Sequence, residues 1–344
     1  MATYEIMNSY REKYANLVNW FILTEVMRGA PEKVYEAASH LIKAGGKRVR
    51  PFIVMAMAKA LGGWEAEKAS LPIAAGVEIF HNFTLIHDDI MDKDEFRRGV
   101  PTTHVVYGVD FAILAGDLAF ALSYKSMELA KVYGLPPHIL ARSYETLTEA
   151  AVRVSEGQAY DMMFEKMESV SYHDYLKMIY LKTGALIEAS ARLGALVASA
   201  YNSEVKANHI EAAGEYGRFV GISFQIRDDI LGVFGDPKIT GKPRYNDLRR
   251  GKKTLLVLYA YDHAETDEEK GLLREVLRGR VHDEESLRRA AEIIAKTGAL
   301  AYAEQMAMSL MRNALQVLDD LPVVDSEAKT ALAELARFVV EREK

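Results

Sequence analysis

Residues 66–99 read AEKASLPIAAGVEIFHNFTLIHDDIMDKDEFRRG, an apolar run that ends in a cluster of acidic residues. Apolar residues recur in this run at three- and four-residue spacing, which predicts a helix over Ala66–Met91. Asp88 and Asp92 are four residues apart, so a helix places both carboxylates on the same face. Because like charges at this spacing repel each other, we expect a cation to compensate them.

The same apolar spacing continues through most of the chain. Strand patterns are sparse, and the β-like run Thr254–Tyr261 has no partner strand, so we interpret it as a buried helix. Further helices are predicted over Glu32–Ala44, Pro51–Leu61, Pro136–Met167, His173–Ala200 and His209–Phe234. No Ser- or Pro-rich linker divides the chain. We therefore predict an all-α fold, a single domain over residues 1–344 with ten or more helices around one core.

Composition excludes several classes of protein. The net charge of the 344-residue chain is -6, which argues against nucleic acid as a partner because phosphate binding normally needs a basic surface. There is no cysteine, so neither a disulfide nor a thiolate metal site is expected. The N-terminus lacks the pattern of a secretory signal, and no apolar stretch has the roughly 18–20 residues of a membrane helix. We therefore expect a cytoplasmic protein without an integral membrane segment.

A second acidic cluster follows in the distant part of the chain. It reads FQIRDDIL over Phe224–Leu231, contains Asp228 and Asp229, and also ends a long apolar helix. It leads into Gly235–Lys253, the longest stretch predicted to be irregular, which is rich in Lys and Arg. A long basic loop in an acidic protein is more often functional than a simple connection. Two acidic clusters in matching contexts suggest two helices that offer carboxylates to one cavity.

Clustered cations complete the set of candidate functional residues. Residues 45–51 read GGKRVRP, and Arg97 and Arg98 follow the first acidic cluster. Flexible glycines, a helix start and clustered cations are suited to binding a diphosphate. Carboxylates without Cys or clustered His suit Mg²⁺ rather than zinc. Each segment taken singly also fits a solvated charged turn, but together they predict a site where a metal bridges a diphosphate and the protein.

In their order along the chain, these motifs resemble those of the trans-polyprenyl diphosphate synthases, the family of farnesyl and geranylgeranyl diphosphate synthases. The archaeal geranylgeranyl type is the most similar, and the resemblance covers roughly Ala38–Thr254. The matching segments are GGKRVRP at 45–51, HDDIMDKDEFRRG at 87–99, GQAYD at 157–161, KTG at 182–184, FQIRDDIL at 224–231, GK at 241–242 and GKKT at 251–254. The resemblance implies the isoprenoid synthase fold, in which helices surround a central cavity, and a homodimer.

The resemblance also implies a role for each matching residue. Three Mg²⁺ ions would be held by Asp88, Asp92 and Asp228, with Asp89 and Asp229 in support. The allylic diphosphate would be bound by Arg97, Lys182, Lys242 and Lys252, and isopentenyl diphosphate by Lys47, Arg50, His81 and Arg98. Thr183 and Gln225 would line the reacting centre, with Gln158 and Asp161 beside it.

The activity implied is head-to-tail prenyl transfer. An allylic diphosphate (dimethylallyl, geranyl or farnesyl) would ionise, C4 of isopentenyl diphosphate would attack the allylic cation, and a proton would leave C2. The released diphosphate can accept that proton, so no protein base is required. Asp88, Asp92, Asp228, Lys182 and Arg97 would act as the catalytic residues, because they stabilise the departing diphosphate.

The second acidic motif departs from the family pattern at one position. The family often has DDxxD there, but the last position in this chain is Gly232. The change leaves Asp228 as the one clear metal ligand of that motif. Asp236, four residues on, is a candidate to compensate through a water molecule.

Product length in this family depends on bulky side chains upstream of the first acidic motif. Here Phe83 stands five residues before Asp88, with Thr84 beside it and Phe80 one turn further back. One aromatic residue at the fifth position, next to a small residue at the fourth, is typical of archaeal geranylgeranyl synthases. We therefore expect a C20 product, with C15 or C25 as alternatives. Simple core packing of both phenylalanines is the other interpretation.

Two other functions remain to be weighed. A class I terpene cyclase is also all-α and has an Asp-rich motif, but it needs no pocket for isopentenyl diphosphate. An inactive partner subunit of a heteromeric synthase usually loses its Asp motifs, whereas Asp88, Asp92 and Asp228 are retained here. The sequence favours the synthase over both alternatives.

Overall fold

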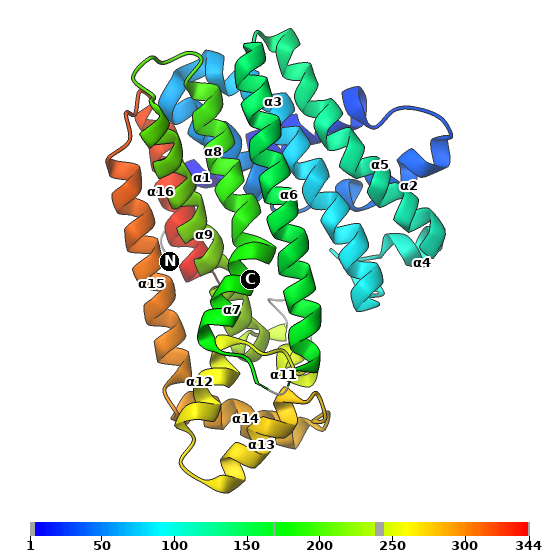
Figure 1. Ribbon diagram of the computed structural model, residues 1–344, viewed down its shortest axis with the longest axis vertical. Coiled ribbons are helices and arrows are strands. Elements are labelled where there is room, and N and C mark those ends of the chain that lie inside the picture. The colour runs from blue at the N-terminus through cyan, green and yellow to red at the C-terminus, as the bar shows by residue number, and fades with distance from the viewer. Residues whose placement is uncertain (1–3, 168, 238–243, 343–344) are drawn as a thin grey trace. The chain divides into compact units, whose positions relative to one another are not determined.

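The computed structural model describes residues 4–167, 169–237 and 244–342, and these are helical almost throughout (Figure 1). The first helices are α1 Glu5–Phe21, η1 Ile22–Val26, α2 Glu32–Lys43, α3 Val49–Asp92, α4 Thr103–Tyr107, α5 Val109–Glu128 and η2 Leu129–Tyr133. They are followed by α6 Pro137–Lys166, α7 Tyr172–Ile179, η3 Tyr180–Gly184, α8 Ala185–Ala198 and α9 Ala207–Phe234. The last are α11 Asn246–Arg249, α12 Leu255–His263, α13 Asp267–Leu277, α14 Glu284–Lys296, α15 Ala299–Asp319 and α16 Ser326–Glu341. The predicted all-α fold with ten or more helices is confirmed.

Helix α3 carries the first acidic cluster at its C-terminal end. It joins the two helices predicted over Pro51–Leu61 and Ala66–Met91, which meet at a kink where Gly63 has φ 73° and ψ -161°. Glycine permits this positive φ because it has no Cβ. Helix α3 is long and apolar enough to span a membrane, yet 78% of its apolar window is buried. Such burial on all sides is expected of a helix in a protein core.

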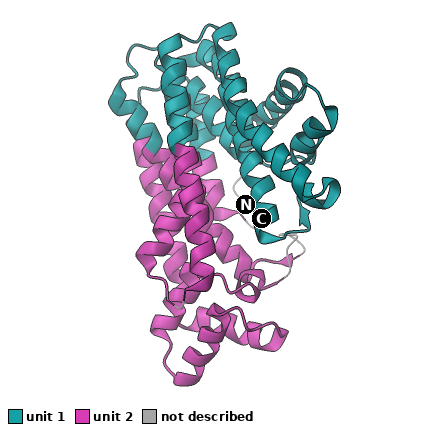
Figure 2. Cartoon of the chain, turned by 45° about the vertical axis from the view of Figure 1, so that its right-hand side comes forward, with its two compact units in different colours: residues 1–149, 189–214, 320–334 teal, residues 150–188, 215–319, 335–344 magenta. Residues whose placement is uncertain are grey.

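The chain divides into two compact units, which are coloured separately in Figure 2. The first comprises residues 1–149, 189–214 and 320–334, and the second comprises residues 150–188, 215–319 and 335–344. The first acidic cluster belongs to the first unit, and the second acidic cluster to the second unit. Four of the five boundaries fall within helices α6, α8, α9 and α16, and the fifth lies at the end of α15. The single domain over residues 1–344 stays a prediction.

The run Thr254–Tyr261, interpreted from the sequence as a buried helix, corresponds to α12. Its residues Leu255, Leu256, Val257, Leu258 and Ala260 are all buried in the second unit. The β-branched and aromatic composition of this run suits a strand, but the described part of the second unit offers no strand to pair with. Burial from every side explains why the run shows no helical periodicity.

Two local predictions were incomplete. A β-hairpin, β1 Phe96–Arg97 and β2 Val100–Pro101, follows α3 and was not predicted. Its two-residue turn has positive φ at both Arg98 (55°) and Gly99 (77°), as in the type I′ turns of tight hairpins. The stretch predicted to be irregular contains the one-turn helix α11, which begins after Tyr245.

Candidate active site

The first acidic cluster lies in the last turn of α3. Asp88 is partly exposed, with 19% of its side chain accessible, whereas the side chain of Asp89 is only 1% exposed. Burial raises the pKa of Asp89 to about 6, although the guanidinium of Arg97 opposes the shift. The two neighbours therefore differ: Asp88 is accessible to a ligand, and Asp89 points into the protein.

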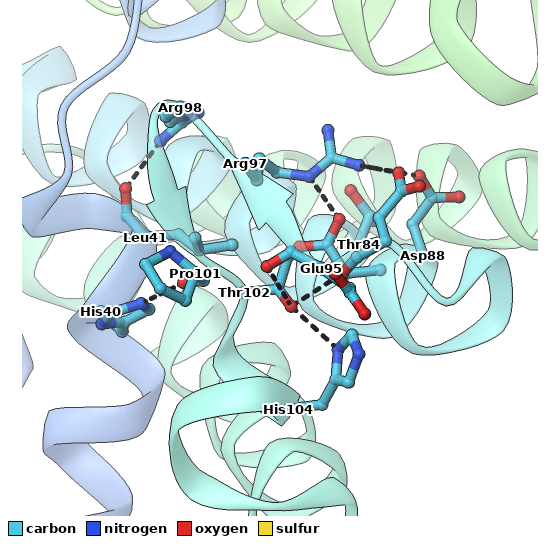
Figure 3. A network of polar contacts seen from close by, with 12 residues as sticks. His40, Leu41, Thr84, Asp88, Glu95, Arg97, Arg98, Pro101, Thr102 and His104 are labelled. Atoms are coloured by element: carbon cyan, nitrogen blue, oxygen red, sulfur yellow. Dashed lines mark hydrogen bonds and ion pairs between the residues drawn. The ribbon is translucent and has the colours of Figure 1, made fainter.

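Arg97 connects the hairpin to this cluster (Figure 3). Its Nε donates to Oδ1 of Asp89, and its Nη2 lies 3.5 Å from Oδ2 of Asp88 and 3.6 Å from Oδ2 of Asp94. The type I′ turn directs the next residue, Arg98, to a different place, where Nη1 donates to the carbonyl of Leu41 at 2.8 Å. The hairpin turn therefore directs the two adjacent arginines to different partners. Arg97 binds the carboxylates of the acidic cluster, and Arg98 binds a backbone carbonyl.

A buried ion pair that was not predicted supports the cationic segment. Nη1 of Arg48 donates to Oε1 of Glu78 at 2.8 Å, and the two side chains are 1% and 3% exposed. Arg48 also donates to Asn19 and to the carbonyls of Ile42 and Gly45. Its backbone is left-handed (φ 49°) and immediately precedes α3. The hydrogen bonds and the ion pair of Arg48 therefore hold the cationic segment, residues 45–51, in place.

The negative charge of Glu78 also acts on the guanidinium groups of Arg50 and Arg98. Burial lowers the pKa of Arg50 to about 10, while the charge of Glu78 opposes the shift and that of Arg98 adds to it. Burial lowers the pKa of Arg98 as well. Nε of Arg50 is buried and has no hydrogen-bond partner among the residues that the structure describes. Three guanidinium groups around one carboxylate leave an excess of positive charge, which suits a polyanion.

His81 lies in the same cationic environment. Burial lowers its pKa well below the usual value, and the charges of Arg50, Arg98 and Arg97 lower it further. The imidazole is therefore neutral at physiological pH, and it can donate only one N–H to a bound oxyanion. Gly46, at φ 140°, permits a close approach, because a Cβ there would lie 2.8 Å from Cζ of Arg98.

In the second unit, the KTG motif forms the π-helical turn η3. π-Helical turns are rare in proteins, and those that do occur are frequently found at functional sites. A Cβ at Gly157 would lie 2.2 Å from the backbone N of Lys182, so only glycine lets α6 pack this closely against η3. The two motifs also pair through side chains, since Nζ of Lys182 donates to Oδ2 of Asp161 at 2.5 Å.

A chain of hydrogen bonds holds Asp229. Thr183 donates to Oε1 of Gln225 at 3.0 Å, and Nε2 of Gln225 donates to Oδ1 of Asp229 at 2.9 Å. The hydroxyl of Tyr175, which was not predicted, donates to Oδ2 of Asp229 at 2.6 Å. Burial, and next the charge of Asp247, raise the pKa of Asp229 to about 7. Asp229, like Asp89, is thus the inward-pointing member of its pair.

Asp228 is the accessible member, with 38% of its side chain exposed. Nη2 of the buried Arg342, beyond the end of α16, donates to its Oδ1. The same nitrogen donates to the carbonyl of Phe224 at 3.1 Å, and the guanidinium lies 3.9 Å from the centre of the Phe224 ring. No local signal in the sequence relates Arg342 to this motif, because more than a hundred positions separate them.

Lys252 lies in a small pocket with Asp161, Phe164, Glu165, Met178 and Lys253. Burial lowers the pKa of Lys252, but the carboxylates of Asp247, Asp161 and Asp229 outweigh this effect and the pKa is raised. Lys252 is therefore a charged, partly buried side chain beside the second acidic cluster. Lys242 was predicted to act with it but lies outside the described residues.

The acidic residues fit Mg²⁺ that is bound together with a diphosphate. Among the residues that the structure describes, no three His, Asp or Glu side chains converge tightly enough to enclose a metal ion. Mg²⁺ does not need such a cage, because it is usually held by one or two carboxylates together with substrate phosphates and waters. Oδ2 of Asp89 is buried and accepts no hydrogen bond from any described residue, which leaves it available to a metal-bound water.

An aromatic cluster lies beneath the first acidic cluster. Ring centroids of Phe83 are 5.5 Å from Phe80, 5.3 Å from Phe120 on α5 and 4.9 Å from His87. Thr84 is partly buried on the same helix and donates its hydroxyl to the carbonyl of His81. Phe80 is 1% exposed, whereas Phe120 is 38% exposed. The tertiary structure therefore packs Phe120, from a second helix, against the phenylalanines predicted to limit product length.

Comparison with known proteins now decides the family. The model of the family described as polyprenyl synthetase matches residues 31–294. The chain belongs to the polyprenyl synthetase family. This polyprenyl synthetase is 51% identical to a geranylfarnesyl diphosphate synthase of Aeropyrum pernix, over 95% of this chain and 100% of that protein. It is 40% identical to a geranylgeranyl diphosphate synthase of Saccharolobus solfataricus, over 98% of both chains.

Solved structures agree with this assignment. A geranylgeranyl pyrophosphate synthetase from Pyrococcus horikoshii has a TM-score of 0.88 and 38% identity, covering 98% of both chains. A geranylgeranyl pyrophosphate synthase from Corynebacterium glutamicum, complexed with isoprenyl diphosphate and magnesium, has a TM-score of 0.81 and 32% identity, covering 99% of this chain and 100% of that one. The predicted family and isoprenoid synthase fold are therefore confirmed, and the protein is a prenyltransferase.

Proposed function

We propose that this polyprenyl synthetase condenses isopentenyl diphosphate with dimethylallyl, geranyl and farnesyl diphosphates to give geranylgeranyl diphosphate and pyrophosphate. The observation that carries the proposal is the cluster of Arg48, Arg50 and Arg98 around Glu78. It is an anion site in addition to the acidic clusters, and a synthase must bind two diphosphates. A terpene cyclase needs only one.

Isopentenyl diphosphate binds to Lys47, Arg50, His81 and Arg98 in this proposal. The guanidinium of Arg98 is held by the fold before the substrate arrives, since it already donates to a backbone carbonyl. Less conformational entropy is then lost on binding. Neutral His81 donates one hydrogen bond without adding charge, while Lys47 is exposed and supplies a cation from the loop.

The allylic diphosphate binds to Arg97, Lys182 and Lys252, with Lys242 as a further candidate, and to three Mg²⁺ ions. Asp88 and Asp92 hold two of the ions and Asp228 holds the third.

When bound, the ions withdraw charge from the departing diphosphate. Thr183 and Gln225 hold Asp229 in place, and Asp161 orients Lys182. Gln158 and Asp161 flank the reacting centre in this proposal. The allylic C–O bond then breaks, C4 of isopentenyl diphosphate forms the new C–C bond, and the C2 proton passes to the released diphosphate.

We test the function with the purified protein, Mg²⁺, isopentenyl diphosphate and each allylic primer in turn, and measure products by chromatography. The synthase requires isopentenyl diphosphate for turnover. Consumption of an allylic diphosphate without it would instead identify a cyclase. No turnover by the protein alone would identify an inactive partner subunit.

Product length is assigned to the aromatic cluster of Phe80, Phe83 and Phe120. We favour C20 because Phe83 is braced by two further rings and by His87. C25 remains the main alternative, since the relative from Aeropyrum pernix is a geranylfarnesyl diphosphate synthase. C15 is less favoured because Thr84 is small.

Replacing Phe83 with Ala is expected to lengthen the product by at least one C5 unit. The change removes a ring from the cluster and opens space in the path of the growing chain. Product chain length is read by chromatography after complete consumption of the primer. Val132→Ala, at a residue 75% exposed, is the control. An unchanged product from Phe83→Ala would show that Phe83 is not the floor.

We also propose a cytoplasmic homodimer. Large apolar side chains are exposed on α4 and α5 at Val105, Val106, Val109, Ile113 and Leu114. Contiguous exposed apolar residues of this kind mark protein interfaces, and a second copy of the chain offers the same self-complementary face. Leu114→Glu is expected to convert the dimer to a monomer in sedimentation velocity, whereas Asp267→Asn, at an exposed residue of α13, leaves it unchanged. A wild-type monomer at micromolar concentration would contradict the proposal.

A further inference from the structure

The glycine that replaces the last acidic residue of the second motif is packed against another carboxylate. A Cβ built on Gly232 would lie 2.0 Å from Oδ2 of Asp247 and 2.6 Å from its Cγ. Such distances are well below van der Waals contact. The space that a side chain at position 232 would enter is therefore already filled by the carboxylate of Asp247.

This space lies on the face of α9 that carries Asp228. Residues 228 and 232 are four apart on one helix, so they share a face and lie one turn from each other. In the first motif, Asp88 and Asp92 have the same spacing. Asp247 thus brings a carboxylate, from a different element, to the face of α9 that carries Asp228.

The backbone of α11 holds Asp247 in this position. The helix begins after Tyr245, which has a left-handed conformation (φ 59°), and the neighbouring Leu248 is fully buried in the core of the second unit. The carbonyl of Asp247 accepts a hydrogen bond from N of Lys252 at 3.0 Å. Asp247 itself is only 8% exposed. An ionisable residue held this firmly, beside a functional motif, is more than a solvated surface charge.

The electrostatic neighbours of Asp247 are the residues of the second acidic cluster. After burial, its charge is the largest cause that raises the pKa of Asp229 and the largest that raises the pKa of Lys252. It also raises the pKa of Tyr175, the hydrogen-bond donor to Asp229. Asp247 therefore faces the same space as the groups around the proposed third metal ion.

We propose that Asp247 supplies, through space, the carboxylate that position 232 lacks, and that it binds the same divalent ion as Asp228 through a water molecule. A water-mediated contact agrees with the finding that no three acidic side chains converge directly on one point among the described residues. The inference rests on the proposed function. It replaces Asp236 as the compensating residue, since Asp236 is exposed and lies beyond the end of α9.

The test measures metal binding rather than turnover. Mn²⁺ is titrated into the full-length protein with inorganic pyrophosphate present, and free Mn²⁺ is followed by electron paramagnetic resonance. Asp247→Asn is expected to lower the affinity of the weakest Mn²⁺ site by roughly 10- to 100-fold. This is the usual effect of losing a group that orients a metal ligand or its water. Exposed Asp267→Asn on α13 is the matched control and is expected to bind as the wild type does.

An exchange of residues provides the sharper experiment. Gly232→Asp alone places two carboxylates in one space and is expected to weaken Mn²⁺ binding or lower the melting temperature. Combined with Asp247→Gly, the same substitution is expected to restore Mn²⁺ affinity to within a few-fold of wild type. The single variant Asp247→Gly, checked by circular dichroism for a native fold, remains weak.

Three outcomes would overturn the inference. In the first, folded Asp247→Asn binds Mn²⁺ as tightly as the wild type; in the second, the exchanged variant binds no better than Asp247→Gly. In the third, Asp236→Asn causes the loss and Asp247→Asn does not. Failure of the proposed function is recognised separately, because the wild type would then neither bind Mn²⁺ with pyrophosphate nor turn over isopentenyl diphosphate, and Asp228→Asn would change nothing.

Discussion

Replacing Asp88 with Asn lowers kcat/KM by roughly 10³-fold, which corresponds to about 4 kcal/mol of transition-state stabilisation. Asn keeps the size of the side chain and the helix but removes the charge that binds Mg²⁺. Ionisation of the allylic diphosphate then proceeds with less compensation for the negative charge that develops on the leaving group. A loss of this size is usual when one preorganised electrostatic group is removed. Steady-state kinetics with isopentenyl diphosphate and geranyl diphosphate measures the change.

Two comparisons make this result specific. Asp110→Asn, at an exposed residue of α5, removes the same charge from the same unit and is expected to leave kcat/KM unchanged. Raising the Mg²⁺ concentration is expected to recover part of the activity of Asp88→Asn. Activity within threefold of wild type at low Mg²⁺ would show that Asp88 does not bind the metal.

Replacing Glu78 with Gln lowers the free energy of unfolding by about 3–5 kcal/mol, the usual cost of removing one member of a buried ion pair. Glu78 and Arg48 are both almost completely buried, so solvent screens their interaction little. Without the carboxylate, Arg48 keeps a buried charge, and the nearby charges of Arg50 and Arg98 repel it. Urea unfolding followed by circular dichroism measures the change.

The control for Glu78 lies on the same helix. Glu65→Gln removes the same charge from an exposed position of α3 and is expected to alter the free energy of unfolding by less than about 0.5 kcal/mol. Bound pyrophosphate is expected to destabilise neither protein. If Glu78→Gln unfolds at the wild-type urea concentration, Arg48 is neutralised by another group and the pair does not hold the cationic segment.

Most of the helices could be predicted because their signals are local. Helix α2 follows Pro31 and ends before Gly45-Gly46, and α9 carries its apolar residues at regular spacing up to Phe234. Both signals act over a few residues, within which propensity and periodicity decide the conformation. The hairpin after α3 was missed because its turn has Arg98, rather than Asn or Gly, at the first left-handed position.

Candidate site residues could be named from the sequence where motifs are contiguous, and their partners were missed where these come from elsewhere in the chain. Asp88 and Asp92 are recognisable from their spacing alone. By contrast, Glu78 is one apolar-flanked acid among many, and Tyr175 and Arg342 belong to segments without any motif. Their roles depend on which surfaces come together when helices pack, and this is a property of the tertiary structure.

The sequence by itself determined an all-α fold with two acidic clusters and separate cations, because short-range spacing encodes helices and motifs. The order of these motifs indicated the polyprenyl synthetase family, which the family match over residues 31–294 confirms. The tertiary structure decided which member of each aspartate pair points inward, since burial raises the pKa of Asp89 and Asp229. It also decided that Asp247 stands against Gly232. The physical reason is that charge burial and side-chain contact depend on packing between distant segments, which local sequence patterns do not specify.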